Sequence, residues 1–589
     1  MAHDLQMPSE SILAIDCGST TTQASLFGQV GGEYRFIAKG EAPSTVEPPW
    51  NDLMASVRQA IWQLSEVTGW LLLDDRGQLI TPERQNGGVD AVVATTSASE
   101  PLRLVLVGIM RDVSLASARR AIGMSNAVVD GLVSMDRRGS GVLNSDIGGQ
   151  VRLINELKPD AVVIVGGVDD GASRPVLQSV EAMALACSAL PPSALRPPLI
   201  YAGNSGLREQ VAEIVGDQAE LRAVDNVRPS LEGENLWALQ AEIEELYRQR
   251  KLERLPGYGT LAAWTPLRVL PTATAFAYTI QYLARLDGIN VLGVDVGGAT
   301  TTVASVLDEQ ADLLIRSDLG LSHSAAGILD HVPVESIVRW LPFEIEPVEI
   351  SNALYNKAIQ NRTVPQTRQD LLLEQAVARE VIRLSLAEMA LRWSHGGSLL
   401  YQGLVPAFDL IVGGGGVLSN VPSYGQAALI LLDAVQPIGV FELALDKARL
   451  VAPLGAVAAL NPLVASQVVA RDALLSLGTV VAPIGSAREG ETALSFEIEY
   501  EDGRSLEVEV AYGSLEVIPL PAGQVANLKL KPTRRFDVGL GVKGMAGETP
   551  AQGGVLGIII DARGRPLPIA ADPEQQREKM QRWLWDMGS

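Results

Sequence analysis

The chain has 589 residues, which at roughly 150 residues per domain predicts about three to five domains. Its 47 Lys and Arg stand against 69 Asp and Glu, and this formal net charge of −22 at pH 7 argues against binding to nucleic acid or to an anionic membrane. Apolar residues reach 47%, aromatic residues only 5%, and there are 56 Gly, a composition typical of an α/β protein.

The cysteines and histidines exclude several kinds of site. Cys17 and Cys187 are too few for a disulfide framework or a cysteine-rich zinc site, and the four histidines have no metal-ligand spacing. No apolar run approaches the ~18 residues of a transmembrane helix, and residues 1–10 do not resemble a signal peptide. We therefore expect a soluble cytoplasmic protein.

The first predicted element is a hairpin over residues 11–27, where SILAID is followed by a Gly/Ser/Thr turn and QASLFG. From about 90 to 228, short apolar strands alternate with helical stretches. The predicted strands are 91–97, 102–109, 126–133, 160–167, 198–203 and 221–225. This alternation predicts a parallel sheet covered by helices.

Residues 231–290 are predicted to be mostly helical, and a second hairpin pattern follows in VLGVDVGGATTTVASVL, residues 291–307. This stretch repeats the first hairpin, AIDCGSTTTQASLF against GVDVGGATTTVASV. A helical stretch over 368–394 then leads to DLIVGGGGVLSN, residues 409–420, where an apolar strand enters four glycines. An internal repeat carries more information than either copy alone.

The last part of the chain differs in pattern. ALSFEIEYEDGRSLEVEVAYG alternates apolar and acidic residues around the turn signal Asp502-Gly503, which predicts an antiparallel hairpin within an all-β module. Asp572-Pro573-Glu574 predicts the start of a final amphipathic helix. Trp583 and Trp585 of that helix are expected to pack on the β module, although a docking surface is the alternative.

The first hairpin turn has the residues of a phosphate site. Asp16 ends an apolar strand, and the turn consists of Gly18, Ser19, Thr20 and Thr21. Glycine lets a backbone approach a ligand closely, successive N–H groups can hold phosphate, and an aspartate can hold Mg²⁺ through water. An ordinary hairpin whose hydroxyls satisfy their own backbone is the alternative for one copy by itself.

The second copy favours the phosphate interpretation. Asp295 is followed by a turn with the same order of parts, Gly297, Gly298, Thr300 and Thr301. Two such turns from two lobes could hold one polyphosphate and its metal, and phosphoryl transfer depends mainly on positioning and charge neutralisation. The glycines that would let a nucleoside pack against the backbone are Gly413, Gly414, Gly415 and Gly416.

The order of these three motifs resembles the actin-like ATPase superfamily. Residues 15–22 resemble its first phosphate motif, 293–302 its second and 409–418 its adenosine motif, while 450–460 resemble the small-residue helix that packs between the lobes. The resemblance implies ATP and Mg²⁺ between two lobes whose closure follows the nucleotide state. It also implies that Asp16 and Asp295 position the metal and an attacking water.

A narrower resemblance, over most of residues 10–465, is to the glutamate mutase accessory proteins of the MutL or GlmL type, which are distinct from the mismatch-repair proteins. The stretches that carry it are DCGSTTT, PDAVVIVGGVDDG, PLIYAGN, PTATA, VDVGGATTTVASV, SDLGLS and IVGGGGVLSN. This resemblance implies an ATP-using chaperone or reactivase of an adenosylcobalamin-dependent mutase such as glutamate mutase.

Together these inferences predict an α/β protein with a two-lobed actin-like, ribonuclease H-like core, an inserted Rossmann-like domain and a C-terminal all-β module. The expected segments are a first lobe over 10–90, an inserted domain over 91–228, a helical connection over 229–290, a second lobe over 291–465, a β module over 475–570 and a helix over 571–589. The inserted domain is a candidate partner-binding surface.

Two other functions remain open. A small-molecule kinase of the same superfamily needs a carboxylate to take the acceptor's proton, and Asp169 could serve. A nucleotide-dependent scaffold with little turnover would suit the acidic surface and the β module. We expect Asp169 and Asp170 to cap a helix, Cys17 to be a small buried residue, and His323 and His395 to be structural.

Overall fold

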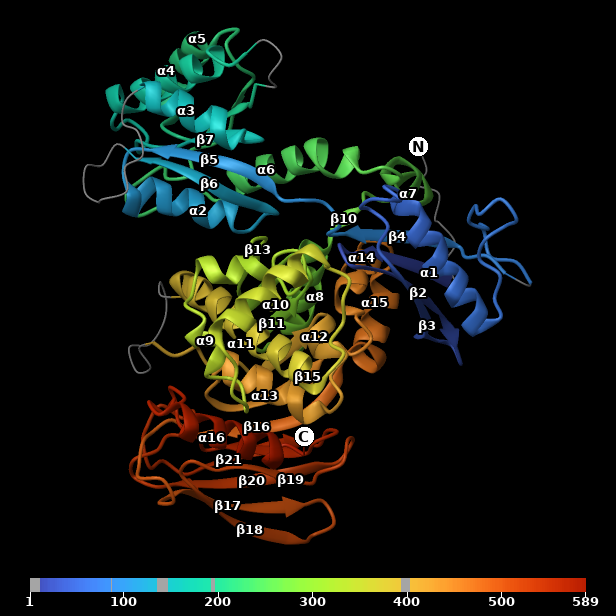
Figure 1. Ribbon diagram of the computed structural model, residues 1–589. Coiled ribbons are helices and arrows are strands. Elements are labelled where there is room, and N and C mark those ends of the chain that lie inside the picture. The colour runs from blue at the N-terminus through green and yellow to red at the C-terminus, as the bar shows by residue number, and fades with distance from the viewer. Residues whose placement is uncertain (1–10, 86, 135–146, 192–195, 394–402, 589) are drawn as a thin grey trace. The chain divides into compact units, whose positions relative to one another are not determined.

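The computed structural model describes residues 11–85, 87–134, 147–191, 196–393 and 403–588, and it divides into two compact units (Figure 1). The larger unit consists of Met1–Ala98, Gly259–Leu313 and Asp318–Ser589. The smaller unit consists of Ser99–Tyr258 and Leu314–Ser317. Each unit has its own sheets and its own core.

The first sheet of the larger unit has five strands in the order β10-β4-β1-β2-β3. Their bounds are β1 Ser11–Cys17, β2 Thr21–Val30, β3 Glu33–Pro43, β4 Ala91–Thr96 and β10 Leu270–Pro271. The predicted hairpin is the antiparallel pair β1–β2, and β1 pairs in parallel with β4. Helix α1, Leu53–Thr68, begins where the Asp52 side chain accepts a hydrogen bond from the Met54 N–H and packs on β3. We call this sheet with α1 the first lobe.

A second sheet begins with the same arrangement, β13-β12-β11-β14-β15. The bounds are β11 Val291–Val296, β12 Thr301–Leu307, β13 Gln310–Arg316, β14 Leu410–Gly414 and β15 Gly439–Leu445. As in the first sheet, a hairpin of two strands is followed by a third strand on one side and a parallel strand on the other. This sheet with its helices is the second lobe, and the repeated order confirms the α/β core with two lobes that the sequence predicts.

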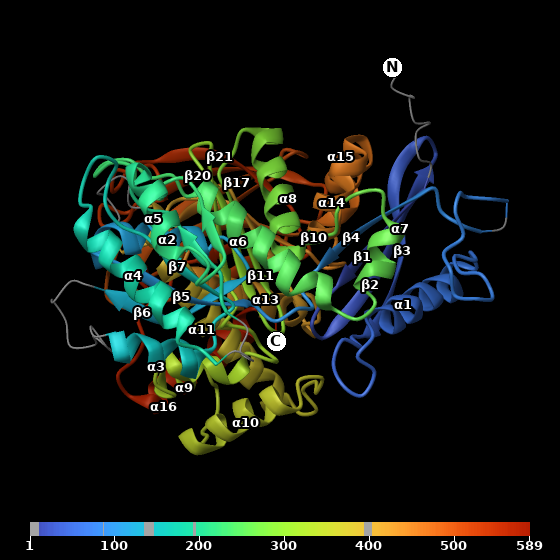
Figure 2. The same cartoon turned by 90° about the horizontal axis from the view of Figure 1, so that it is seen from above.

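Two helices pack between the lobes. Helix α8, Thr272–Asp287, contacts strands of both sheets, and α14, Val451–Leu460, packs on α8 and on β1 and β4 (Figure 2). A Cβ atom on Gly455 would lie 1.9 Å from the Ala275 carbonyl oxygen, so α14 approaches α8 closely only because this residue is glycine. The small residues of 450–460 thus form the helix that the sequence predicts there.

The C-terminal strands divide between two sheets. Strands β16 (Leu475–Ala482), β22 (Ile558–Asp561) and β19 (Leu515–Ile518) extend the second-lobe sheet to eight strands. A separate antiparallel sheet has the order β18-β17-β20-β21, with bounds Ser505–Ala511, Thr492–Tyr500, Val525–Pro532 and Gly547–Gln552. Within the predicted β module over 475–570, three described strands therefore belong to the second-lobe sheet and four form a sheet of their own.

A buried ion network fixes this extension. Arg563 donates to Asp561 and, at 2.8 Å, to Asp433 of α13 (Tyr424–Val435), and all three side chains are fully buried. The Arg563 guanidinium also lies 4.6 Å from the ring centroid of Trp583 in α16, Pro573–Asp586. Trp583 therefore packs inside, as expected, while Trp585 is 81% exposed.

The smaller unit is a parallel sheet in the order β6-β5-β7-β8-β9 (Figure 1). Its strands are β5 Leu102–Gly108, β6 Ala127–Ser134, β7 Ala161–Ile164, β8 Leu199–Tyr201 and β9 Leu221–Ala223. Helices α3 (Ile147–Leu157), α4 (Arg174–Ser188) and α5 (Arg208–Val215) cover one face, and α2 (Ala116–Ile122) lies on the other. This is a doubly wound α/β arrangement: the chain adds β6 on one side of β5 and then adds β7, β8 and β9 on the other side.

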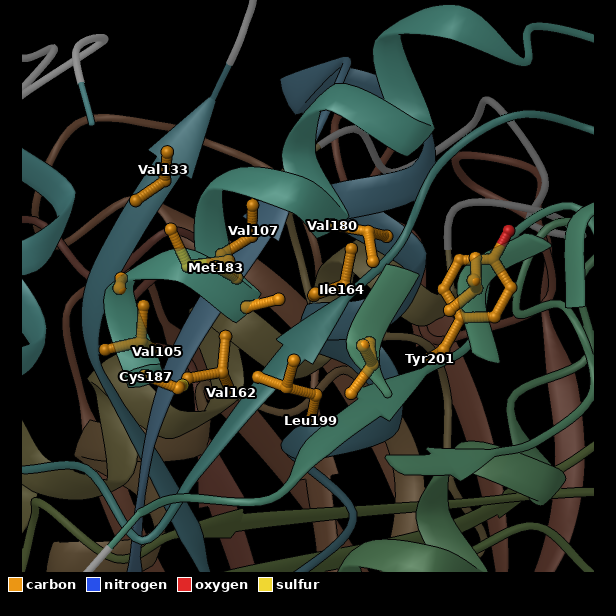
Figure 3. Packing of buried hydrophobic residues seen from close by; sticks show 14 of the residues in the cluster. Val105, Val107, Val133, Val162, Ile164, Val180, Met183, Cys187, Leu199 and Tyr201 are labelled. Atoms are coloured by element: carbon orange, nitrogen blue, oxygen red, sulfur yellow. The ribbon is translucent and has the colours of Figure 1, made fainter. Parts of the chain in front are cut away.

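Figure 3 shows the core of the smaller unit, where α4 packs on the sheet. Val105, Val162 and Ile164 of the strands meet Met183 and Cys187 of the helix. Burial raises the pKa of the Cys187 thiol to about 11, and burial likewise raises the pKa of Cys17, which ends β1 with no exposed surface. Both free cysteines are therefore apolar core residues, as expected for Cys17.

The ion network predicts a stability difference between two arginines. Replacing Arg563 by Met leaves Asp433 and Asp561 buried with fewer cationic partners, so we expect the free energy of unfolding to fall by about 3 kcal/mol. The matched control is Arg504→Met, because Arg504 pairs with Asp502 on an exposed hairpin. This substitution should change the free energy of unfolding by less than about 0.5 kcal/mol. Urea unfolding measures both, and equal effects would contradict the role of the network.

Candidate functional site

The first predicted site begins at the end of β1. The Asp16 side chain accepts hydrogen bonds from the hydroxyls of Thr95 at 2.6 Å and Thr272 at 2.8 Å, which hold its carboxylate in one orientation. The turn after it is closed by the Gly18 N–H, which donates to the Thr21 carbonyl at 3.0 Å. A Cβ atom on Gly18 would lie 2.7 Å from that oxygen, so this turn requires glycine.

The second turn repeats this geometry at the end of β11. The Gly297 N–H donates to the Thr300 carbonyl at 2.9 Å, as Gly18 does to Thr21. The two turns also meet, because a Cβ atom on Gly298 would lie 2.7 Å from Cγ2 of Thr20. The two copies of the repeat are far apart in sequence, and their turns thus come together at one site in the larger unit.

The hydroxyl residues of the turns are not equivalent. Ser19, Thr20 and Thr21 each keep part of their surface exposed, and so does Thr300. Thr301 begins β12 and is fully buried, so its hydroxyl is not on the surface of the turn.

The four glycines after β14 likewise have different surroundings. A Cβ atom on Gly413 would meet Leu431 and Leu418 in the core, and one on Gly414 would lie 2.9 Å from the Asp295 carboxylate. Gly415 has a φ of +89° and Gly416 has open space around its Cα. Gly413 is therefore needed for packing, Gly414 for room beside Asp295, and only Gly416 leaves free surface at the position predicted to face a nucleoside.

A third carboxylate, which the sequence analysis did not single out, lies near Asp295. Asp446 follows β15 and accepts hydrogen bonds from the N–H groups of Leu450 at 2.7 Å and Val451 at 3.0 Å. The stretch FELALD ends in an aspartate just as the strands before Asp16 and Asp295 do. That shared ending is the signal that could have identified Asp446.

Burial raises the pKa of all three carboxyl groups, and the nearby charge of Arg449 offsets part of this shift in each. Burial, and then the charges of Asp446 and Asp16, raise the pKa of Asp295 to about 7. Burial raises the pKa of Asp446 to about 6, and it also raises that of Asp16. Asp16 and Asp295 still keep part of their surface exposed, so a cation could reach them.

The amide of Gln23 adds an oxygen to this group. Gln23 lies opposite Asp16 in the β1–β2 pairing, and its nitrogen donates to the carbonyls of Ala448 at 3.2 Å and Arg449 at 3.0 Å. Those two acceptors fix the amide orientation, because a flipped amide would bring oxygen against oxygen. Among the described residues, the buried Oε1 atom of Gln23 has no hydrogen-bond partner.

The carboxylate and amide oxygens of this group fit a hydrated magnesium ion. Mg²⁺ prefers oxygen ligands, keeps several waters and is held by one or two carboxylates together with substrate phosphates. Within the described ranges, no group of three or more His, Cys, Asp or Glu is close enough to hold a metal by itself. The carboxylates could bind waters of the ion, and Oε1 of Gln23 could accept a hydrogen bond from such a water. This combination matches the chemistry of Mg²⁺.

Other candidate residues lie elsewhere. In the smaller unit, Asp169 accepts hydrogen bonds from the Ser205 N–H and the Asn226 amide, both at 2.9 Å. Partial burial favours a higher pKa for Asp169, but these hydrogen bonds outweigh it and lower the pKa. Helix α4 begins after Ser173, so Asp169 connects loops and does not cap that helix. His395 lies outside the described residues.

The chain was compared with solved structures, curated proteins and protein families. It resembles a glycerol dehydratase reactivase (13% identity, 77% of this chain and 100% of that chain, TM-score 0.29). It also resembles the activator of the 2-hydroxyisocaproyl-CoA dehydratase from Clostridium difficile (11% identity, 78% and 97%, TM-score 0.25) and nucleotide-free acetone carboxylase (11% identity, 85% and 81%, TM-score 0.34). These TM-scores are low, so the likenesses indicate no function for this chain.

No match was found among the curated proteins. In the part of the chain that the structure describes, no helix is both long and apolar enough to cross a membrane. A family model described as MutL protein matches residues 12–473, a range that contains both hairpin turns and all three carboxylates. The chain therefore belongs to the MutL family of glutamate mutase accessory proteins.

Proposed function

We propose that this protein binds Mg-ATP between its two lobes and uses the nucleotide to act on a partner enzyme. The observation that carries the proposal is the meeting of two glycine turns beside three carboxylates whose pKa values are raised. Burial still raises all three pKa values although Arg449 lies nearby, and a bound Mg²⁺ would supply the further charge neutralisation that phosphoryl transfer requires.

Each part of the site has a role in this proposal. Asp16, oriented by two threonine hydroxyls, and Asp295 would hold the waters of the metal and orient the water that attacks the terminal phosphate. The backbone N–H groups and exposed hydroxyls of the turns would hold the phosphates; these residues are Gly18, Ser19, Thr20, Thr21, Gly297, Gly298 and Thr300. Gly416 would face the adenosine, and Thr301 would act through its backbone, because its side chain is buried.

For the partner, we propose an adenosylcobalamin-dependent mutase such as glutamate mutase, on the basis of the family to which the chain belongs. The doubly wound smaller unit is a candidate surface for this partner, since its sheet and core are complete in themselves. ATP hydrolysis coupled to remodelling of the partner is the proposed activity.

The first test is Mg-ATP binding by isothermal titration calorimetry. Asp295→Asn keeps the shape of the side chain and removes its charge, so we expect the affinity for Mg-ATP to fall at least about tenfold. The matched control is Asp502→Asn, on the exposed β17–β18 turn, which should bind as the unchanged protein does. Absence of Mg-ATP binding to the unchanged protein would overturn the proposed function.

The raised carboxyl pKa values predict how stability without nucleotide depends on pH. In the folded protein Asp295 holds a proton up to about pH 7, whereas the unfolded chain releases it near the ordinary value of 3.8. Stability is therefore expected to fall as pH rises from 5 to 8, and Asp295→Asn should be more stable than the unchanged protein at pH 8. Thermal unfolding over this range measures the effect, and a carboxylate that stabilises the fold would give the opposite order.

The partner proposal predicts rescue of an inactive mutase. Glutamate mutase that has lost activity during turnover should regain it when this protein and Mg-ATP are added together with fresh adenosylcobalamin. Asp295→Asn should fail to restore activity, because the nucleotide step would be impaired. Equal recovery with and without ATP would contradict an ATP-dependent role.

A further inference from the structure

Each phosphate turn is supported by a second segment of its own lobe. In the first lobe the Ser44 N–H, just after β3, donates to the Thr20 carbonyl at 2.9 Å. We call residues 44–50 the first support. A shift of this segment must move the carbonyl of the turn with it, because the hydrogen bond joins backbone to backbone.

The second turn has a more extensive support, residues 320–324. The N–H groups of Leu321 and Ser322 donate to the carbonyls of Gly297 at 3.1 Å and Gly298 at 2.7 Å, and the Ser324 hydroxyl donates to Ala299 at 2.8 Å. A Cβ atom on Gly320 would lie 2.6 Å from the Gly298 carbonyl oxygen, so the two segments are in close contact. The second support is thus bonded to three successive residues of the turn.

The two supports are joined to each other across the lobes. Oε1 of Glu47, in the first support, lies 2.7 Å from Nε2 of His323, in the second. Asn361 follows α10 (Pro347–Ile359), and its side-chain amide donates to Oε2 of the same Glu47 at 3.0 Å. The Ser322 hydroxyl donates to the Asn361 carbonyl, so the cluster is also tied to the second support.

A neighbouring arginine strengthens the connection. Arg362 donates to the Ser44 carbonyl at 2.5 Å, on the residue whose N–H holds the first turn. Its guanidinium also lies 4.9 Å from the ring centroid of Trp50. Arg362 of the second lobe therefore contacts both ends of the first support, Ser44 and Trp50.

The ionisation of Glu47 follows from its contacts. Partial burial opposes ionisation of Glu47, but the hydrogen bond from Asn361 and the nearby His323 outweigh it and lower the pKa of Glu47. The ionised Glu47 accepts a hydrogen bond from the Asn361 amide at Oε2 and contacts Nε2 of His323 at Oε1, and the Asn361 amide nitrogen lies 2.8 Å from the same Nε2. The bonds are therefore charge-assisted, the stronger class of hydrogen bond.

We propose that Glu47, His323 and Asn361 form a latch, a set of contacts between the lobes that keeps the two phosphate turns in a fixed position relative to each other. These are positioning residues: they act on the nucleotide through the supports and not by touching it. This inference rests on the proposed function, because it assigns the latch to the same nucleotide. With the latch closed, the two turns stay together and nucleotide leaves slowly; with it open, the lobes separate more easily and nucleotide leaves faster.

The first experiment needs no nucleotide. Spin labels at Trp62→Cys in α1 and Val348→Cys in α10, both exposed positions, report the distance between the lobes by double electron–electron resonance, and the native Cys17 and Cys187 are buried. Glu47→Ala and His323→Ala should broaden or lengthen the distance distribution. A distribution unchanged from that of the otherwise unmutated protein would overturn the latch, whether or not the protein binds ATP.

The second experiment measures release of a fluorescent ATP analogue with Mg²⁺ by stopped flow. Loss of the charge-assisted bonds should speed release about tenfold in Glu47→Ala and in His323→Ala, and the double variant should be no faster than either. Additive effects, or unchanged release, would overturn the proposal.

Two further variants separate the latch from a general loss of structure. His331→Ala is the matched control, because His331 pairs with Asp318 at 2.8 Å within the second lobe and should leave release unchanged. His323→Gln keeps a donor that can reach Glu47 and should restore slow release. If His331→Ala speeds release as much as His323→Ala, or if His323→Gln fails to restore it while folded, the latch assignment is wrong.

Discussion

The burial of three carboxyl groups is the constraint on which the centre of this structure depends. Asp16, Asp295 and Asp446 lie at the ends of three strands, where burial raises all three pKa values and the charges of the other two raise that of Asp295 further. A fold that served stability alone would gain by replacing one of them, because an unpaired buried charge is costly. The arrangement is understandable as a cation site that is favourable only when its ligand is bound.

The scaffold around these carboxylates depends on close backbone approach. Gly455 lets α14 lie against α8, Gly414 leaves room for the Asp295 carboxylate, and Gly298 lets the second turn meet Thr20. A side chain at any of these positions would separate parts that must touch. Glycine in this protein therefore sets the distances between the repeated parts and does more than permit sharp turns.

The parts added to the repeat are attached in two different ways. The smaller unit has a complete parallel sheet with its own core. The C-terminal strands instead continue the second-lobe sheet, and Arg563 joins Asp561 of β22 to Asp433 of α13 in the buried interior. The smaller unit is thus a compact body in itself, whereas the C-terminal region is part of the second lobe.

The sequence by itself determined the local features of this protein. Alternation of apolar residues gave the hairpins, and the repeat of Asp followed by Gly and Thr located Asp16, Asp295 and their turns, because such patterns depend on neighbours along the chain. Only the tertiary structure decided which carboxyl and amide groups join them. Asp446 and Gln23 lie far apart in sequence, as do Glu47 and His323, and their proximity follows from how the two lobes pack, which no local pattern records.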